Sequence, residues 1–321
     1  MNKTFKKAIG IRRNIAEKRK AILIVRAKLL DAARFWLNKQ GFVEIQGPTL
    51  IPAVSEQSNS FLVNFFDKKA NLSSGLQPYS DVFVDELEKI YTIAPSFRAE
   101  YAQPKRKLSE FWRIEVVARP LDLKGVINLQ AKFLEHICQT VSKSATDQLK
   151  KLGRSAGEIS KVKAPFLILT YDDVVEQLQR IGQQIYWGQT LDIEMEQNLS
   201  SMFEKPFFIC DFPVCDETFF HMDNPERPEL SLSADLLAPD GYGEIASSGQ
   251  MINNRKILLR KIREMKINPE NKKWYLNLKR FSVLPQSGFA FGVERILKWL
   301  CGIEDIREIT TFPRSYEQIY P

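Results

Sequence analysis

Apolar and polar residues follow two periodic patterns along the chain, one typical of helices and one typical of strands. The pattern predicts helices at residues 17–40, 81–88, 124–152, 171–182, 253–266 and 293–301. Strand-like runs cover residues 42–45, 89–100, 110–119, 206–212, 230–238 and 287–291. Because the strands do not alternate regularly with helices, we expect an α+β fold. Its sheet should be mostly antiparallel and flanked by helices, not doubly wound and parallel.

Three segments stand apart from this pattern. Residues 54–80 are polar and predict a loop, and residues 150–163 predict a possible flexible insertion. Residues 1–28 predict a basic N-terminal helical extension ahead of one large domain over 29–321. The extension holds ten Lys or Arg residues and one acid, Glu17, whereas the whole chain has a net charge of +7. The body of the chain is therefore close to neutral.

The basic extension leaves three interpretations open. Its apolar side chains, among them Ile9 and Ile15, can pack on the body while the basic face stays solvated. The same basic face can instead approach the phosphates of an RNA. An organelle targeting sequence is the third alternative, although the segment is rich in Lys rather than in Ser and Arg.

The supply of His and Cys residues narrows the possible chemistry. The chain has only two histidines, His136 and His221, so a histidine-based metal site or a Ser-His relay is nearly excluded. Its four cysteines follow neither a zinc spacing nor a disulfide framework, which favours free thiols in the cytoplasm. No run approaches the roughly 20 apolar residues of a membrane span, so we expect no membrane partner.

Two predicted strands around residues 96–117 bring charged and aromatic side chains to one face. With a period of two residues, Arg98 and Glu100 share a face of the first strand, and Phe111 lies on one face of the second. A hairpin-like connection places the three side chains within reach of each other. An arginine can grip a phosphate, a carboxylate can accept from an amino group, and a ring can stack on a base. A solvated face with cross-strand ion pairs is the alternative.

Residues 287–296 predict an apolar strand that turns at Gly292 into a helix. Arg295 falls in the first turn of that helix, beside free backbone N–H groups and the positive end of the helix dipole. Such a position is well suited to hold a phosphate. Ordinary helix-start chemistry is the alternative.

The segment from Asp235 to Glu244 predicts a strand, a turn and a returning strand. This arrangement can bring the two carboxylates together as a magnesium site, since Mg²⁺ uses few protein ligands and keeps several waters. Alternatively, Asp240-Gly241 is a simple hairpin turn and both acids are solvated.

Taken in order, these segments resemble the catalytic domain of the class II aminoacyl-tRNA synthetases, in the asparaginyl/aspartyl branch. FRAEYAQPKRKLSEFWRIE (97–115) is similar to motif 2 of that family, SGFAFGVERI (287–296) to its motif 3, and GFVEIQGP (41–48) to its motif 1. The resemblance covers about residues 20–314. It implies the class II catalytic fold, ATP and Mg²⁺ as ligands, and a homodimer through residues of roughly 20–50.

The resemblance also implies roles for individual residues. Arg98 would contact the α-phosphate and Arg295 the bent triphosphate, and these two would be the catalytic residues. Glu100 would lie at the adenine end, Phe111 would stack on the adenine ring, and Lys107 would hold a terminal phosphate. The remaining implied contacts are those of Glu244 with ATP, of Asp235 and Glu244 with Mg²⁺, and of Glu56, Gln77, Ser247 and Met251 with the amino acid.

The chain departs from the family pattern in three ways. The family's Gly-Gly-Ser-x-Arg appears here as residues 247–251, so that Met251 replaces the arginine that grips the substrate side chain. A methionine can neither pair with a carboxylate nor donate to an amide, which argues against aspartate or asparagine specificity. The β-barrel that reads the anticodon in that family is not expected ahead of the catalytic domain. Lys107 stands where a histidine is usual.

Three functions follow from the resemblance and its departures. The first is an enzyme similar to the archaeal asparagine synthetase-related proteins. It would activate an amino acid with an Asp/Asn-like or altered side chain, release pyrophosphate, and pass the acyl group to ammonia or an amine. The second is transfer to a tRNA, a carrier or a protein without anticodon reading. The third, from a different class, is a non-catalytic synthetase-like regulatory or binding module.

Overall fold

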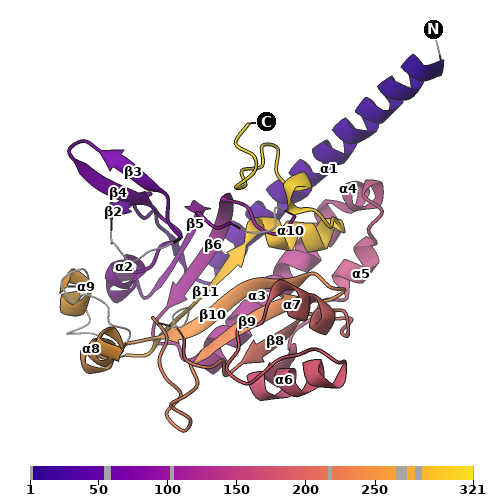
Figure 1. The fold of residues 1–321 in the computed structure, drawn as a ribbon. Helices are drawn as coiled ribbons and strands as arrows, with labels where there is room; N and C mark the ends of the chain where they lie inside the picture. Colours follow the sequence, from indigo (N-terminus) through magenta and orange to yellow (C-terminus); the bar gives the residue numbers. More distant parts are fainter. Residues whose placement is uncertain are drawn as a thin grey trace.

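The chain, seen in a computed structural model, is built on one large mixed β-sheet (Figure 1). The structure describes residues 3–53, 59–101, 105–215, 219–264, 273–278 and 284–320. From edge to edge the sheet contains β1 (Val43–Glu44), β5 (Lys89–Phe97), β6 (Glu110–Ala118), β11 (Gln286–Gly292), β10 (Gly243–Met251), β9 (Ser233–Ala238), β8 (Phe207–Cys210) and β7 (Leu167–Thr170). Only the β1–β5 and β7–β8 pairs of this sheet are parallel. The predicted α+β fold is therefore confirmed.

One face of the sheet carries the main hydrophobic core. α1 (Lys3–Lys39), α3 (Leu123–Ser144) and α10 (Val293–Cys301) pack on it, together with the short helices α4 (Thr146–Lys151) and α5 (Ala156–Ser160). Phe133 of α3 is fully buried, and its ring centroid lies 5.5 Å from that of Phe289 and 5.4 Å from that of Phe291. Each such side chain contributes roughly 2 kcal/mol of burial free energy. This packing fixes the central strands from behind.

The opposite face is covered at its two ends. α6 (Tyr171–Arg180) and α7 (Ile193–Ser200) form a second core with Ile209 and Leu237 at one end. At the other end α2 (Ser80–Leu87) packs over Ile90 and Val117. A small sheet of β2 (Leu50–Pro52), β4 (Lys68–Leu72) and β3 (Leu62–Phe65) lies beyond this end, as do α8 (Arg255–Glu264) and α9 (Lys273–Leu278) (Figure 1). The middle of the sheet, formed by β6, β11 and β10, lines a cleft.

Three segments differ from the sequence-based expectation. The predicted loop at 54–80 contains β3 and β4, whose exposed strands lack a continuous apolar face. Residues 150–163 contain the end of α4 and the whole of α5 rather than a flexible insertion, because Ile159 and Val162 are buried in the main core. α1 continues without a break past residue 28, and Val25 is already fully buried.

The arrangement of α1 bears on the three interpretations of the basic extension. Its N-terminal turns project beyond the rest of the chain (Figure 1), whereas Ile22, Val25 and Leu29 pack in the main core. The interpretation of a helix packed through an apolar stripe therefore holds from residue 21 onward. Among the described residues, no helix combines the length and the apolar character needed to cross a bilayer.

Candidate active site

The middle of the sheet forms the floor of a cleft of about 1300 Å³. Because alternate residues of a strand face the same side, Glu115, Ala290, Ser247 and Asp235 form one row across β6, β11, β10 and β9. The next row along the same strands contains Val117, Gly288, Gly249 and Ser233. Of these residues, Ser233, Asp235, Ser247 and Ala290 line the cleft, so its floor is made mostly of small residues and a flat ligand can lie close to the backbone.

Three arginines from different strands and a helix converge at one end of this cleft. Arg98 follows β5, Arg113 belongs to β6, and Arg295 stands in the first turn of α10. Burial, followed by the nearby charge of Arg113, lowers the pKa of the Arg98 guanidinium. The three guanidinium groups lie close enough for the charges of Arg113 and Arg295 to act on Arg98. This end of the cleft is therefore suited to a multiply charged anion such as a triphosphate.

The nucleotide-binding residues proposed from the sequence surround Arg98. Its Cζ atom lies 5.9 Å from the centroid of the Phe111 ring. Glu100 lies 3.6 Å from Arg98 and 2.7 Å from Nζ of Lys107. Lys107 and Arg98 together hold the pKa of Glu100 below its ordinary value, although burial acts in the opposite direction. The ring, the carboxylate and the lysine thus all line the cleft.

Arg295 is held in place by Glu244. Its Nη1 lies 2.9 Å from the Glu244 carboxylate and donates to the Glu244 carbonyl oxygen at 3.3 Å. Glu244 raises the pKa of Arg295 more than burial lowers it. In return, Arg295 keeps the pKa of Glu244 below its ordinary value despite the burial of that carboxylate. Both groups are therefore charged at neutral pH.

A neighbouring contact ties this end of the cleft to α1. Glu294, which is 3% exposed, receives a hydrogen bond of 2.7 Å from Arg26 and another of 2.9 Å from the backbone N–H of Trp112. Glu294 therefore connects α1, β6 and the first turn of α10. The ion pair fixes the helix start on which Arg295 stands.

The two acids expected at a magnesium site both line the cleft. Asp235 belongs to β9 and Glu244 to β10, and both influence the pKa of Arg295. In the part of the chain that the structure describes, no group of three or more His, Cys, Asp or Glu side chains converges as a metal site. Two carboxylates fit a magnesium ion whose other ligands are nucleotide oxygens and waters. The donor set is therefore compatible with Mg²⁺ bound together with a triphosphate.

A third acid, Glu196 of α7, reaches the same end of the cleft and was missed in the sequence. Its Oε2 accepts from the Glu244 backbone N–H at 3.3 Å. Burial and the charge of Glu244 raise the pKa of Glu196 to about 7. The sequence signal that places Glu196 in the site is weak, because α7 is short and its position depends on packing against β9 and β10.

The raised pKa of Glu196 predicts a pH-dependent stability. Folded Glu196 keeps its proton up to a pH of about 7, whereas the unfolded chain releases it near pH 4.5. As the pH rises from about 4.5 to about 7, the wild type therefore loses folding stability. Above pH 7 the loss stays constant. We expect Glu196→Gln to lie close to the wild type at pH 4.5 and to exceed it by about 3 kcal/mol at pH 8.

Urea unfolding at the two pH values measures this difference. Glu194→Gln, on the exposed side of the same helix, is the matched control. A stability gain for Glu196→Gln that is equal at both pH values would contradict a buried titrating carboxylate.

The residues expected to hold the amino acid are only partly brought together. Ser247 lines the cleft. Gln77 and Met251 lie next to each other, with Nε2 of Gln77 donating to Sδ of Met251 at 3.0 Å, but neither lines the cleft itself. Glu56 lies outside the described residues. His221, which pairs with Met251, also lines the cleft, although no sequence pattern singled it out as a site residue.

Comparisons with known proteins agree with this geometry. The sequence matches the family of tRNA synthetases class II (D, K and N) over residues 6–316. Asparagine–tRNA ligase of Chloroflexus aurantiacus is 37% identical over 312 residues, which cover 95% of this chain and 71% of the relative. Asparagine–tRNA ligase of Thermococcus gammatolerans is 33% identical over 302 residues, with 94% and 70% covered.

Solved structures give the same result. The asparaginyl-tRNA synthetase of Pyrococcus horikoshii, complexed with asparaginyl-adenylate, matches with a TM-score of 0.90 and 33% identity. The match covers 95% of this chain and 70% of that one. The asparaginyl-tRNA synthetase of Entamoeba histolytica, also with asparaginyl-adenylate, matches with a TM-score of 0.86 and 25% identity over 94% of this chain and 69% of that one.

The fold and the cleft thus define the catalytic domain of a class II aminoacyl-tRNA synthetase. The chain belongs to the family of tRNA synthetases class II (D, K and N) and is an ATP-dependent ligase. It spans about 70% of the length of the asparaginyl-tRNA synthetases that it matches.

Proposed function

We propose that this chain activates an amino acid as its aminoacyl adenylate, and that the cleft is the site of this reaction. An oxygen of the substrate carboxylate attacks the α-phosphorus of ATP, a new C–O–P linkage forms, and the bond to the β-phosphate breaks to release pyrophosphate. The attacking carboxylate is already ionised, so the step needs no general base. The convergence of Arg98, Arg113 and Arg295 at one end of the cleft carries this proposal.

The side chains act by holding the reactants and balancing charge. Arg98 would stabilise the negative charge that builds on the α-phosphate, and Arg295 would hold the triphosphate from the side of α10. Phe111 would stack on the adenine ring, Glu100 would lie at its amino group, and Lys107 would hold a terminal phosphate. Fixing two reactants in this way removes most of the entropic cost of their encounter.

We also propose that Asp235 and Glu244 hold Mg²⁺. Their carboxylate oxygens are hard ligands, and the position of both residues beside Arg295 supports contact with a bound triphosphate. The ion would neutralise charge on the phosphate oxygens. Through its ion pair with Arg295, Glu244 would also hold the Arg295 guanidinium toward the triphosphate.

The acceptor that we propose is a small nucleophile such as ammonia or an amine. Its nitrogen would attack the acyl carbon of the adenylate, AMP would leave, and the nitrogen would lose a proton to solvent. A tRNA is the second candidate, because the relatives at 33–37% identity are named asparagine–tRNA ligases. The free thiols of Cys138, Cys210 and Cys301 support a reducing, cytoplasmic location for either reaction.

Amino-acid-dependent exchange of labelled pyrophosphate into ATP tests the first step directly. The assay contains Mg²⁺ and each standard amino acid in turn, and we expect exchange with at least one of them. Failure of ATP to bind, measured by calorimetry, would contradict the proposed function. Product analysis with ammonia and with total tRNA then distinguishes the two acceptors.

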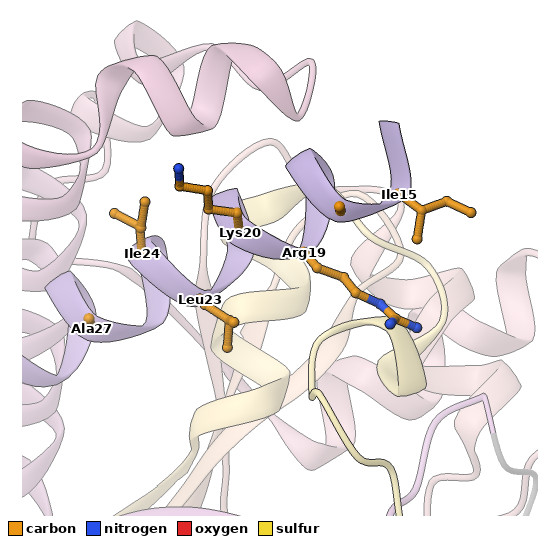
Figure 2. Close-up of a pocket in the computed structure, with 7 residues that line it drawn as sticks. Ile15, Arg19, Lys20, Leu23, Ile24 and Ala27 are labelled. Atoms are coloured by element: carbon orange, nitrogen blue, oxygen red, sulfur yellow. The ribbon is translucent and has the colours of Figure 1, made fainter. Parts of the chain in front are cut away.

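We further propose that the chain forms a homodimer through α1, β1 and β2. Three apolar side chains on these elements are exposed, with Phe35 at 62%, Val43 at 44% and Leu50 at 48%. The exposed side of α1 continues this apolar character, since Figure 2 shows Ile15, Leu23, Ile24 and Ala27 along a groove beside Arg19 and Lys20. Exposed apolar surface of this kind is typical of an interface.

Light scattering at micromolar concentration tests the dimer. We expect the wild type at twice the chain mass of 37.1 kDa and Phe35→Asp at the monomer mass, because a buried carboxylate opposes association. Tyr186→Asp is the control, since Tyr186 is also exposed but lies near α6. A monomeric wild type would contradict this interface.

A further inference from the structure

His221 lines the cleft near Met251 at the end of β10, whereas Arg295 follows Gly292 at the opposite end of the neighbouring strand β11. The segment around His221 lies beside β10, where His221 pairs with Met251 and the backbone N–H of Met222 donates to Gln250 at 2.8 Å. The His221 ring leans over Gly249, so closely that a Cβ on Gly249 would lie 2.5 Å from Nε2. His221 therefore occupies the space that a side chain at position 249 would fill.

The backbone of His221 is anchored from behind. Lys261 of α8 is 1% exposed, and its Nζ donates to the His221 carbonyl oxygen at 2.7 Å. The same Nζ pairs with Asp223 at 2.6 Å. The charge of Lys261 is thus balanced by Asp223. This anchoring gives the imidazole a defined position in the wall of the cleft.

The imidazole itself is neutral. Its Nδ1 is sealed from solvent and has no hydrogen-bond partner among the residues that the structure describes. Burial, together with the nearby charge of Lys261, lowers the pKa of His221 to about 4. At neutral pH the ring offers an uncharged surface with one donor and one acceptor nitrogen.

No positive charge of the described residues lines this end of the cleft. The cations that line the cleft as a whole come from β6, from α10 and from the segment between β5 and β6. They are Arg98, Arg106, Lys107, Arg113, Arg295 and Lys298. The charged residue of the floor nearest to Gly249 is the acid Asp235, one row away. An ionised carboxylate would therefore be desolvated here beside another negative charge, which is unfavourable.

We propose that His221 is a specificity-determining residue, and that its imidazole contacts the end of an uncharged substrate side chain and excludes an acidic one. This inference rests on the proposed function, because it assigns the side-chain end of the same amino-acid site. Met251, which the sequence singled out, does not line the cleft and contacts Gln77 instead.

Pyrophosphate exchange with a panel of amino acids, run on the wild type and on His221→Ala, tests the assignment. We expect the best uncharged amino acid to exceed aspartate and glutamate in kcat/KM by about a hundredfold in the wild type. In His221→Ala, the ratio of kcat/KM between that amino acid and its homologue with one more methylene should shift by about tenfold. The KM for ATP should stay within about twofold.

His136→Ala is the matched control, because His136 is the only other histidine and lies on α3 beside Phe35 and Trp36. His221→Asn serves as a second variant in case the alanine variant folds poorly. Binding of non-reactive aminoacyl-sulfamoyl adenosines with asparaginyl, leucyl and aspartyl groups, followed by calorimetry, gives a readout that is independent of turnover.

The outcomes separate the inference from the proposed function. Preferred exchange with aspartate or glutamate would overturn the inference while the function stands. An unchanged substrate ratio in both His221 variants would also overturn it. ATP binding without exchange or analogue binding for any amino acid would overturn the inference together with the activation step.

Discussion

Arg98→Ala should lower kcat/KM for pyrophosphate exchange by about a thousandfold while the fold stays intact. Arg98 lies where the α-phosphate is expected, close to Phe111, Arg113 and Arg295. Removing its guanidinium takes away a charge that acts on the transition state more than on bound ATP. The loss should therefore appear mainly in kcat, and the far-UV spectrum and melting temperature should change little.

Arg180→Ala is the matched control for this variant. Arg180 pairs with Glu176 on the exposed surface of α6, so its removal should leave exchange unchanged. Normal turnover by Arg98→Ala would refute the proposed active site. If Arg180→Ala lost as much exchange activity as Arg98→Ala, the loss would reflect a general effect of removing an arginine.

Glu244→Gln is expected to lower exchange by about a hundredfold and to raise the Mg²⁺ concentration needed for half-maximal rate. The substitution removes a carboxylate from the proposed metal site. It also removes the charge that holds Arg295 at 2.9 Å, so that Arg295 loses its fixed direction. Both effects weaken the grip on the triphosphate.

Titration of the exchange rate with MgCl₂ distinguishes the two roles of Glu244. Glu176→Gln, at an exposed carboxylate on α6, should show the wild-type titration curve. A hundredfold loss with an unchanged magnesium requirement would show that Glu244 only orients Arg295, and the metal assignment would then be wrong.

The elements that carry the arginine end of the cleft could be predicted because their signals are local. The period of two in β5 and β6 places Arg113 and Phe111 on one face, and the turn at Gly292 starts the helix that carries Arg295. These signals depend on residues only a few positions apart. The structure accordingly finds Arg98, Phe111, Asp235, Glu244 and Arg295 in one cleft.

The residues that were missed come from segments whose position is set by distant partners. Glu196 lies on an eight-residue helix that is placed by packing against β9 and β10. His221 reaches the cleft because its segment pairs with the end of β10 and is anchored by Lys261, 40 residues later in the chain. Neither contact leaves a periodic pattern in the sequence. The hairpin β3–β4 was missed for a similar reason, since most of its residues are at least partly exposed.

Two glycines on the central strands beside the cleft restrict how the substrate range of such an enzyme can evolve. A Cβ on Gly288 would lie 2.7 Å from the backbone oxygen of Val116, and one on Gly249 would overlap the His221 ring. The first obstacle is backbone and cannot move aside, so position 288 is closed to single substitutions. The second obstacle is a side chain. A change of substrate in this lineage is therefore expected to begin at His221 in the wall, and only afterwards to become possible at Gly249 beneath it.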